Sequence, residues 1–117
     1  FYAIMLNMLN FLTEFNQLRE YLNESGMRLL YIGGQNCGVC HAVQPKLTAL
    51  LSAFPGVIAA QTTIEQIPEL ASELHVLTVP AVLFFVDCKE LWREARFIRM
   101  SEIERQISLW SEYYRLF

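Results

Sequence analysis

The residues of this chain best suited to chemistry are two cysteines, Cys37 and Cys40, which form a C-x-x-C pair within the segment GGQNCGVCHAVQP. This spacing is typical of a redox dithiol, in which one thiolate attacks a disulfide and the second sulfur resolves the product. His41 extends the pattern to C-x-x-C-H, the attachment signature of c-type haem. The motif alone leaves both chemistries open, so the surrounding elements must decide between them.

The dithiol is predicted to lie between a buried strand and the first turn of a long helix. Residues 28–32, RLLYI, form an apolar run closed by two glycines, which is typical of a strand buried on both faces. Apolar residues then keep helical spacing over residues 36–54, and Pro45 is expected to kink this helix. The helix N-terminus would favour a thiolate at Cys37, with Cys40 on the same helical face.

Haem and zinc fit the surrounding residues less well. A c-type haem needs an open pocket and usually a second axial ligand, whereas this motif follows a strand and opens a helix. A zinc site needs four ligands, and beyond the pair the chain offers only Cys88, His41 and His75. We therefore expect no metal and no cofactor other than a redox-active disulfide. Cys88 and His75 are expected to be ordinary exposed residues.

Composition favours one packed domain over residues 1–117 and limits the partners of the chain. A chain of 117 residues is long enough to bury a core without disulfide bonds, and its composition, 54% hydrophobic and 18% charged, is that of a packed domain. The formal charge of −3 includes no basic block, so no nucleic acid partner is expected. No apolar run reaches the roughly 18 residues that cross a bilayer, so no membrane partner is expected. Three cysteines are too few for a disulfide scaffold, and two of them lie in a C-x-x-C motif. This pattern suits a reducing compartment, so we expect the protein in the cytoplasm.

The first residues, FYAIMLNML, are apolar and uncharged, but they lack the basic leader and cleavage site of a signal peptide. Residues 1–8 could be an N-terminal extension or could be foreign to the natural chain. If they are natural, such an apolar segment could lie in a groove of a partner or of a second copy. A homodimer through this segment is therefore an alternative to the monomer.

The remaining elements alternate between strands and helices, which predicts an α/β layer structure. Thr13 is a candidate N-cap for an amphipathic helix ending near Gly26, and Ser101 with Glu104 forms a capping box for the last helix. The other predicted elements are an edge strand at 8–12, strands at 57–60, 81–86 and 91–98, a hairpin turn at VDCKE, and a short helix at 68–74. The aromatic residues expected to pack in the core or between helices are Trp92, Phe97, Trp110, Tyr113 and Tyr114.

In their order along the chain, these features resemble the thioredoxin family over about residues 9–114. The strand RLLYI is followed by C-G-V-C, by Pro45 five residues after the second cysteine, and by Thr78-Val79-Pro80 before the strand AVLFF. The resemblance implies a thioredoxin fold, with a mixed central β-sheet of four to five strands flanked by helices. It also implies that Pro80 is a cis proline facing the dithiol, and that the backbone of Val79 pairs with bound substrate.

The chain departs from the family around the dithiol. Where thioredoxins read W-C-G-P-C-K, Asn36, Val39 and His41 replace the tryptophan, proline and lysine. Tyr31 lies six residues before Cys37, where the family has a buried aspartate that assists proton transfer. Asn36, Val39, His41 and Tyr31 could tune the dithiol, since a protonated His41 would favour the thiolates. Tyr31 is more simply interpreted as a core or pocket-lining ring.

We therefore expect a thiol-disulfide oxidoreductase that exchanges electrons with protein disulfides. Cys37 would attack, Cys40 would resolve, and Val79 with Pro80 would bind the substrate. A thiol reductant or a thioredoxin-reductase-like donor would recharge the dithiol. The alternative is a thioredoxin-like binding module whose dithiol does not turn over, which the missing tryptophan, proline and buried acid favour.

Overall fold

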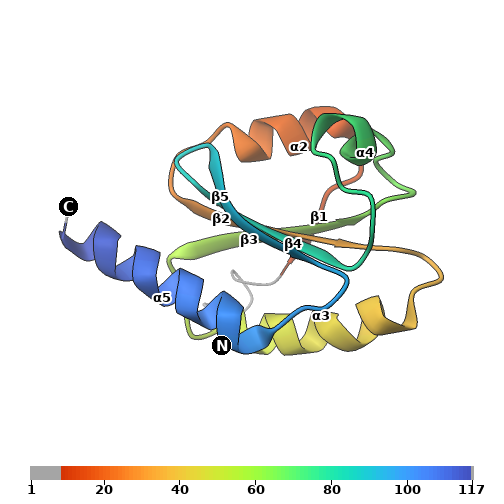
Figure 1. The fold of residues 1–117 in the computed structure, drawn as a ribbon. Coiled ribbons are helices and arrows are strands. Elements are labelled where there is room, and N and C mark those ends of the chain that lie inside the picture. The colour runs from red at the N-terminus through yellow and green to blue at the C-terminus, as the bar shows by residue number, and fades with distance from the viewer. Residues whose placement is uncertain (1–8, 117) are drawn as a thin grey trace.

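The computed structural model describes residues 9–116. Within them, strands and helices alternate along the chain, as Figure 1 shows. In order they are β1 (Asn10–Phe11), α2 (Phe15–Leu22), β2 (Met27–Gly33), α3 (Gly38–Leu51), β3 (Val57–Thr63), α4 (Glu69–Glu73), β4 (Ala81–Val86), β5 (Lys89–Ala95) and α5 (Met100–Leu116). The predicted alternation of strands and helices is confirmed.

The strands form one mixed sheet in the order β1-β3-β2-β4-β5. β1, β3 and β2 run parallel, whereas β4 lies antiparallel to both β2 and β5. Helices α2 and α4 cover one face of the sheet, and α3 and α5 cover the other (Figure 1). This is the thioredoxin fold that the resemblance implied, and it places β2, which leads to the dithiol, at the centre of the sheet.

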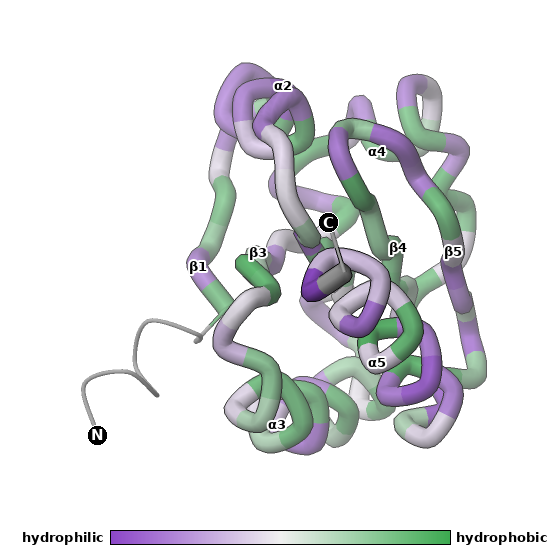
Figure 2. The backbone as a smooth tube through the Cα atoms, turned by 90° about the vertical axis from the view of Figure 1, so that its left-hand side faces the viewer, coloured by the Kyte–Doolittle hydropathy of each residue, from purple (hydrophilic) through white to green (hydrophobic). Residues whose placement is uncertain are grey.

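Two hydrophobic clusters, one on each face of the sheet, hold the layers together. Strand β2 contributes Leu29 and Tyr31 to the cluster beneath α3 and α5, and Leu30 and Ile32 to the cluster beneath α2 and α4. Every residue of β2 is buried, including the charged Arg28, and this burial explains why residues 29–32 are a continuous apolar run. In Figure 2, hydrophobic residues gather in β3, β4 and α3, whereas hydrophilic residues dominate α2 and much of β5.

Strand β3 is longer than its apolar residues indicate. The predicted strand ends at Ala60, but pairing with β2 continues through Gln61 and Thr62 to Thr63. The side-chain amide of Gln61 donates a hydrogen bond of 2.9 Å to the carbonyl of Leu9, and the Thr62 hydroxyl donates one of 2.8 Å to the carbonyl of Leu12. These polar side chains fasten the short edge strand β1, whose existence the sequence predicted correctly.

Helix α2 begins and ends at residues other than those predicted. Its N-cap is Glu14, so the prediction of Thr13 is wrong by one residue. The side-chain carbonyl of Gln17 accepts hydrogen bonds from the backbone N–H groups of both Thr13 and Glu14, which fixes the start of the helix. The helix ends at Leu22, four residues before Gly26, which adopts a φ of +99° in the turn into β2.

The hairpin between β4 and β5 is tighter than predicted. Its turn consists of Asp87 and Cys88, which have φ values of 49° and 72°, as a two-residue hairpin turn requires. The outer residues of VDCKE therefore belong to the strands. Strand β5 covers residues 89–95 and not 91–98, because Arg96 at a φ of 76° turns the chain away from the sheet.

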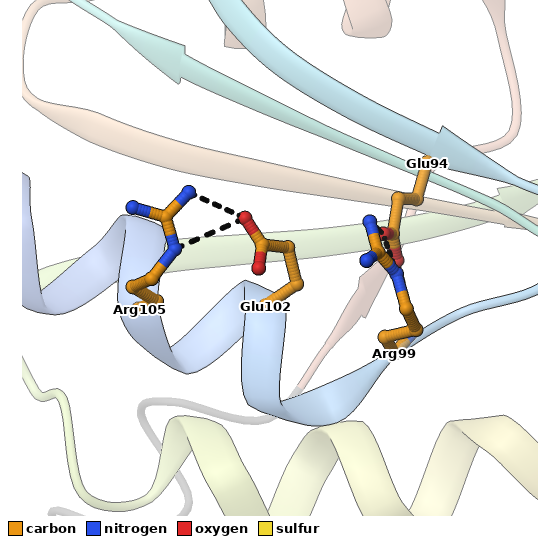
Figure 3. A network of polar contacts seen from close by, with 4 residues as sticks. All are labelled: Glu94, Arg99, Glu102 and Arg105. Atoms are coloured by element: carbon orange, nitrogen blue, oxygen red, sulfur yellow. Dashed lines mark hydrogen bonds and ion pairs between the residues drawn. The ribbon is translucent and has the colours of Figure 1, made fainter.

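Helix α5 begins at Met100, so Ser101 lies inside the helix and the predicted capping box is wrong. Instead, a carboxylate from the preceding strand accepts a backbone hydrogen bond at the start of the helix. Glu94 of β5 accepts hydrogen bonds from the backbone N–H of Arg99 at 2.8 Å and from its Nε at 2.6 Å. Figure 3 shows this pair beside the Glu102–Arg105 ion pair on the first turns of α5. The S-x-x-E pattern missed this contact because Glu94 lies on the strand before the helix, five residues from Arg99.

The aromatic residues follow the prediction in part. Trp92, Trp110 and Tyr114 pack against the cluster beneath α3 and α5, and the ring of Tyr113 meets Trp110 edge-on at 5.2 Å. Phe97 is 79% exposed, so its predicted core position is wrong; it lies in the turn that follows β5. The predicted dimer contact through the apolar N-terminus falls on residues 1–8, outside the described residues.

Candidate active site

The two cysteines lie at the start of α3, just after the loop that follows β2. Cys37 is the N-cap of α3, and its Sγ accepts a hydrogen bond of 3.1 Å from the backbone N–H of Cys40. Their Cα atoms are 5.2 Å apart and the two sulfurs form a disulfide. Cys37 is half-buried, whereas Cys40 is only 4% exposed. The N-terminal amides of the helix therefore favour negative charge on the more accessible sulfur.

Tyr31 lies directly against the backbone of Cys40. Its ring is buried among the residues that α3 and α5 cover, and its hydroxyl donates a hydrogen bond of 2.6 Å to the backbone carbonyl of Cys40. Burial raises the pKa of Tyr31 to about 12. The interpretation of Tyr31 as a core and cleft-lining ring is confirmed, and at neutral pH the residue acts as an uncharged anchor for the first turn of α3.

The Tyr31 hydroxyl should make stability depend on alkaline pH. The pKa of Tyr31 rises from 10.0 to about 12 on folding, so the folded chain keeps a proton that the unfolded chain releases. This stabilisation is complete below about pH 10 and is lost as the pH rises through 12. Tyr31→Phe should lower the free energy of unfolding by about 1 kcal/mol at neutral pH through the lost hydrogen bond, and should flatten the alkaline decline.

Urea unfolding of both proteins at about pH 8 and about pH 11 tests this expectation. Tyr21 and Tyr114 also have raised pKa values, but they contribute equally to the parent protein and to the variant. The difference between the two proteins therefore isolates Tyr31. An equal decline in both proteins would show that the hydroxyl is not the responsible group.

The Val79-Pro80 segment lies beside the dithiol, and its peptide bond is cis, as the resemblance implied. A Cβ atom on Gly34 would lie 3.2 Å from Cγ2 of Val79 and 3.6 Å from Cβ of Cys37. A side chain at this position would therefore push the Val79 methyl group away by a few tenths of an ångström, which glycine avoids. Pro80 is buried, and among the described residues neither the backbone N–H nor the carbonyl of Val79 has a hydrogen-bond partner. The segment therefore presents unpaired backbone next to Cys37.

Glu65 belongs to this neighbourhood, although the sequence analysis did not select it. Its carboxylate accepts a hydrogen bond of 3.1 Å from the backbone N–H of Gln35, in the loop that leads to Cys37. Glu65 follows β3, and the ends of the parallel strands β2 and β3 lie at the same edge of the sheet. An acidic residue just beyond a strand was the signal that could have identified it. Its position indicates that it orders the loop before the dithiol.

The remaining predicted residues differ in their distance from the dithiol. Asn36, Val39 and His41 are exposed around it, and Val39 is 59% exposed. Cys88 is a free, exposed thiol in the hairpin turn, at the end of the sheet where β2 begins. His75 is exposed and follows α4, where its carbonyl accepts a hydrogen bond from Arg93. Both residues are therefore away from the site, as expected.

Comparisons with known proteins agree with this geometry. The family model described as Thioredoxin matches residues 10–107. The thioredoxin-like protein YdfQ of Bacillus subtilis is 32% identical over 100 residues, which cover 86% of this chain and 87% of that protein. Thioredoxin 1 of Chlorobaculum tepidum is 31% identical over 72 residues, covering 61% of this chain and 71% of that protein.

Solved structures repeat the fold at low sequence identity. Thioredoxin from Trypanosoma brucei brucei gives a TM-score of 0.81 at 16% identity, covering 92% of this chain and 94% of that one. Oxidised mitochondrial thioredoxin 3 from Saccharomyces cerevisiae gives a TM-score of 0.75 at 21% identity, covering 91% and 97%. The fold and the dithiol define a thiol-disulfide oxidoreductase. The chain belongs to the thioredoxin family.

Family membership decides between the two chemistries that the C-x-x-C-H pattern left open. The Cys37–Cys40 pair is a thioredoxin-type dithiol and not a haem attachment site. Among residues 9–116, no three His, Cys, Asp or Glu side chains gather in a group that could hold a metal ion. None of the helices described in that range is long and apolar enough to cross a membrane.

Proposed function

We propose that Cys37 is the attacking nucleophile and Cys40 the resolving thiol in the reduction of protein disulfides. The observation that supports this assignment is the asymmetry between the two sulfurs. Cys37 is the more accessible of the two, and the helix amide of Cys40 donates to its sulfur. Cys40 is 4% exposed, so a substrate disulfide reaches its sulfur with difficulty. The Cys37 sulfur, in contrast, is close enough to Cys40 to form a disulfide with it.

The reaction proceeds in two exchanges. The Cys37 thiolate attacks one sulfur of the substrate disulfide, forms a mixed disulfide and releases the other substrate sulfur as a thiolate. Cys40, once deprotonated, attacks Sγ of Cys37 and releases the second substrate sulfur. The substrate gains two electrons and the Cys37–Cys40 disulfide is left oxidised. A thiol reductant or a thioredoxin-reductase-like donor then restores the dithiol.

Substrate docks along Val79 and Pro80 in this proposal. The unpaired N–H and carbonyl of Val79 can pair with the backbone of an extended peptide. The contact between Val79 and Gly34 places that peptide beside Cys37. A reducing compartment suits a dithiol that is recharged by thiols, so we place this activity in the cytoplasm. Asn36 and Val39, exposed next to the sulfurs, would adjust the reduction potential.

Reduction of insulin with dithiothreitol as the electron source tests the proposed function. The protein should accelerate insulin reduction well beyond dithiothreitol alone, and Cys37→Ser should return the rate to that background. A binding module would behave differently, since it would retain a stoichiometric partner after Cys37→Ser and would give no acceleration. Those two results together would replace the proposed function with the binding module.

A further inference from the structure

The resolving step requires a base, and the site described so far contains none that faces Cys40. The Cys40 side chain is buried against Gly33, where an added Cβ would lie 3.4 Å from its Cβ and 3.8 Å from its Sγ. A buried thiol must lose its proton before it can attack, because the thiolate is the nucleophile. The group beneath it, Tyr31, already donates its hydroxyl to the Cys40 carbonyl.

An open cleft of about 120 Å³ connects Cys40 with solvent. Its walls come from β1, β2, β3 and the first turns of α3, and the residues that line it include Gln44, Gln61 and Thr62. A polar cleft of this size holds a few water molecules. His41, which is exposed, lines the same cleft as Cys40. The proton of Cys40 therefore has a route outward as well as a histidine beside that route.

Few of the charged and titratable groups around the cleft could act as the base for Cys40. From β2, Tyr31 faces Cys40, but its pKa of about 12 keeps it protonated at neutral pH. From the loop after β3, the carboxylate of Glu65 binds the N–H of Gln35 and does not line the cleft. The cleft residues of β1 and β3 carry no ionisable side chain, and within this described lining His41 carries the imidazole nitrogen that can accept a proton.

We propose that His41 is the general base that deprotonates Cys40 through this cleft, an inference that rests on the proposed function. The imidazole accepts the Cys40 proton through water in the cleft, because adjacent side chains of a helix do not face each other. The Cys40 thiolate then attacks Sγ of Cys37, the Cys37–substrate bond breaks, and the Cys37–Cys40 bond forms. The departing substrate thiolate takes a proton from the imidazolium or from solvent. No oxidant or reductant beyond the substrate disulfide and the dithiol takes part.

Stopped-flow reaction with dithionitrobenzoate separates the two exchanges. The reduced protein first releases one thionitrobenzoate as Cys37 attacks, and then releases the second as Cys40 resolves the mixed disulfide. The second phase is unimolecular, so its rate reports the resolving step. All proteins carry Cys88→Ser, because an exposed free thiol would also release thionitrobenzoate. The second phase is measured across pH for the parent protein, His41→Gln and, as a matched control, His75→Asn.

In the parent protein the second phase should be fast near pH 7, because the imidazole can take the Cys40 proton. His41→Gln should slow it about 100-fold near pH 7, and the remaining rate should then depend on hydroxide as the base. Added imidazole should restore part of the rate in His41→Ala, which a purely structural role of His41 would not allow. The control His75→Asn should match the parent protein.

Two results would overturn the inference. The first is a second phase in His41→Gln with the rate and the pH profile of the parent protein. The second is slowing in His41→Ala that imidazole does not relieve. Failure of the proposed function would look different, because the parent protein itself would then show no second phase and would not close the Cys37–Cys40 disulfide.

Discussion

Cys40→Ser is expected to accumulate mixed disulfides with protein substrates, whereas Cys37→Ser is expected to accumulate none. The accessible Cys37 sulfur can still attack when Cys40 is absent, but nothing then resolves the product. In Cys37→Ser the remaining Cys40 sulfur is buried at 4% exposure and lacks the N-cap position. Both variants should reduce insulin no faster than dithiothreitol alone, so the two differ in trapping and not in turnover.

Non-reducing electrophoresis followed by mass spectrometry measures the trapped species. Cys88→Ser is included throughout, so that the exposed turn thiol forms no adducts. In the trapped complex, the N–H of Val79 should also gain protection from hydrogen exchange if substrate backbone pairs with it. Adducts that form on Cys40 in Cys37→Ser, but not on Cys37 in Cys40→Ser, would reverse the assigned roles.

Phe84→Ala is expected to cause the largest loss of stability among single truncations in the sheet. Phe84 lies in β4, is 1% exposed, and belongs to the core cluster that α3 and α5 cover. Removing a buried phenyl ring loses its transfer free energy and leaves a cavity, which costs about 3–5 kcal/mol. Because the total stability of a domain is typically about 5–15 kcal/mol, this variant should be close to unfolding.

Phe97→Ala is the matched control for this substitution, because the same ring is removed from a side chain that is 79% exposed. Its free energy of unfolding should stay within about 0.5 kcal/mol of the parent protein. Urea unfolding of the oxidised proteins, with equal m-values, measures both changes. Similar losses in the two variants would contradict the placement of Phe84 in the core and of Phe97 on the surface.

The sequence predicted those parts of the fold that depend on local pattern. Strands β2 and β4 are apolar because both of their faces are covered, and the cysteines open α3 because helical spacing begins just after them. The boundary errors occur where a side chain outside the expected motif holds the end of an element. Gln17 fixes the start of α2, and Glu94 of β5, five residues before Arg99, accepts the N–H of Arg99 just before α5. Other contacts, such as those of Asp87 with Gly26 and Tyr114, join residues far apart in the sequence and could not be predicted from a local pattern.

The sequence likewise indicated some residues of the candidate site and not others. Spacing alone indicated Cys37 and Cys40, and the resemblance supplied Val79 and Pro80. The hydrogen bond from Tyr31 to the Cys40 carbonyl could not be predicted, because a tyrosine in an apolar strand looks like an ordinary core residue. Glu65 was missed because its partner, Gln35, lies 30 residues away in the sequence. The cleft that joins Cys40 and His41 exists only once β1, β3 and α3 have come together.

A redox titration of the purified protein tests the central claim most directly. The protein is equilibrated in glutathione or dithiothreitol redox buffers, free thiols are trapped with an alkylating agent, and the modified cysteines are mapped by mass spectrometry. We predict a reversible two-electron transition confined to Cys37 and Cys40, whose midpoint states whether the dithiol tends to reduce or to oxidise its partners. If those two cysteines never pair reversibly, the claim that this dithiol exchanges electrons with substrates is contradicted.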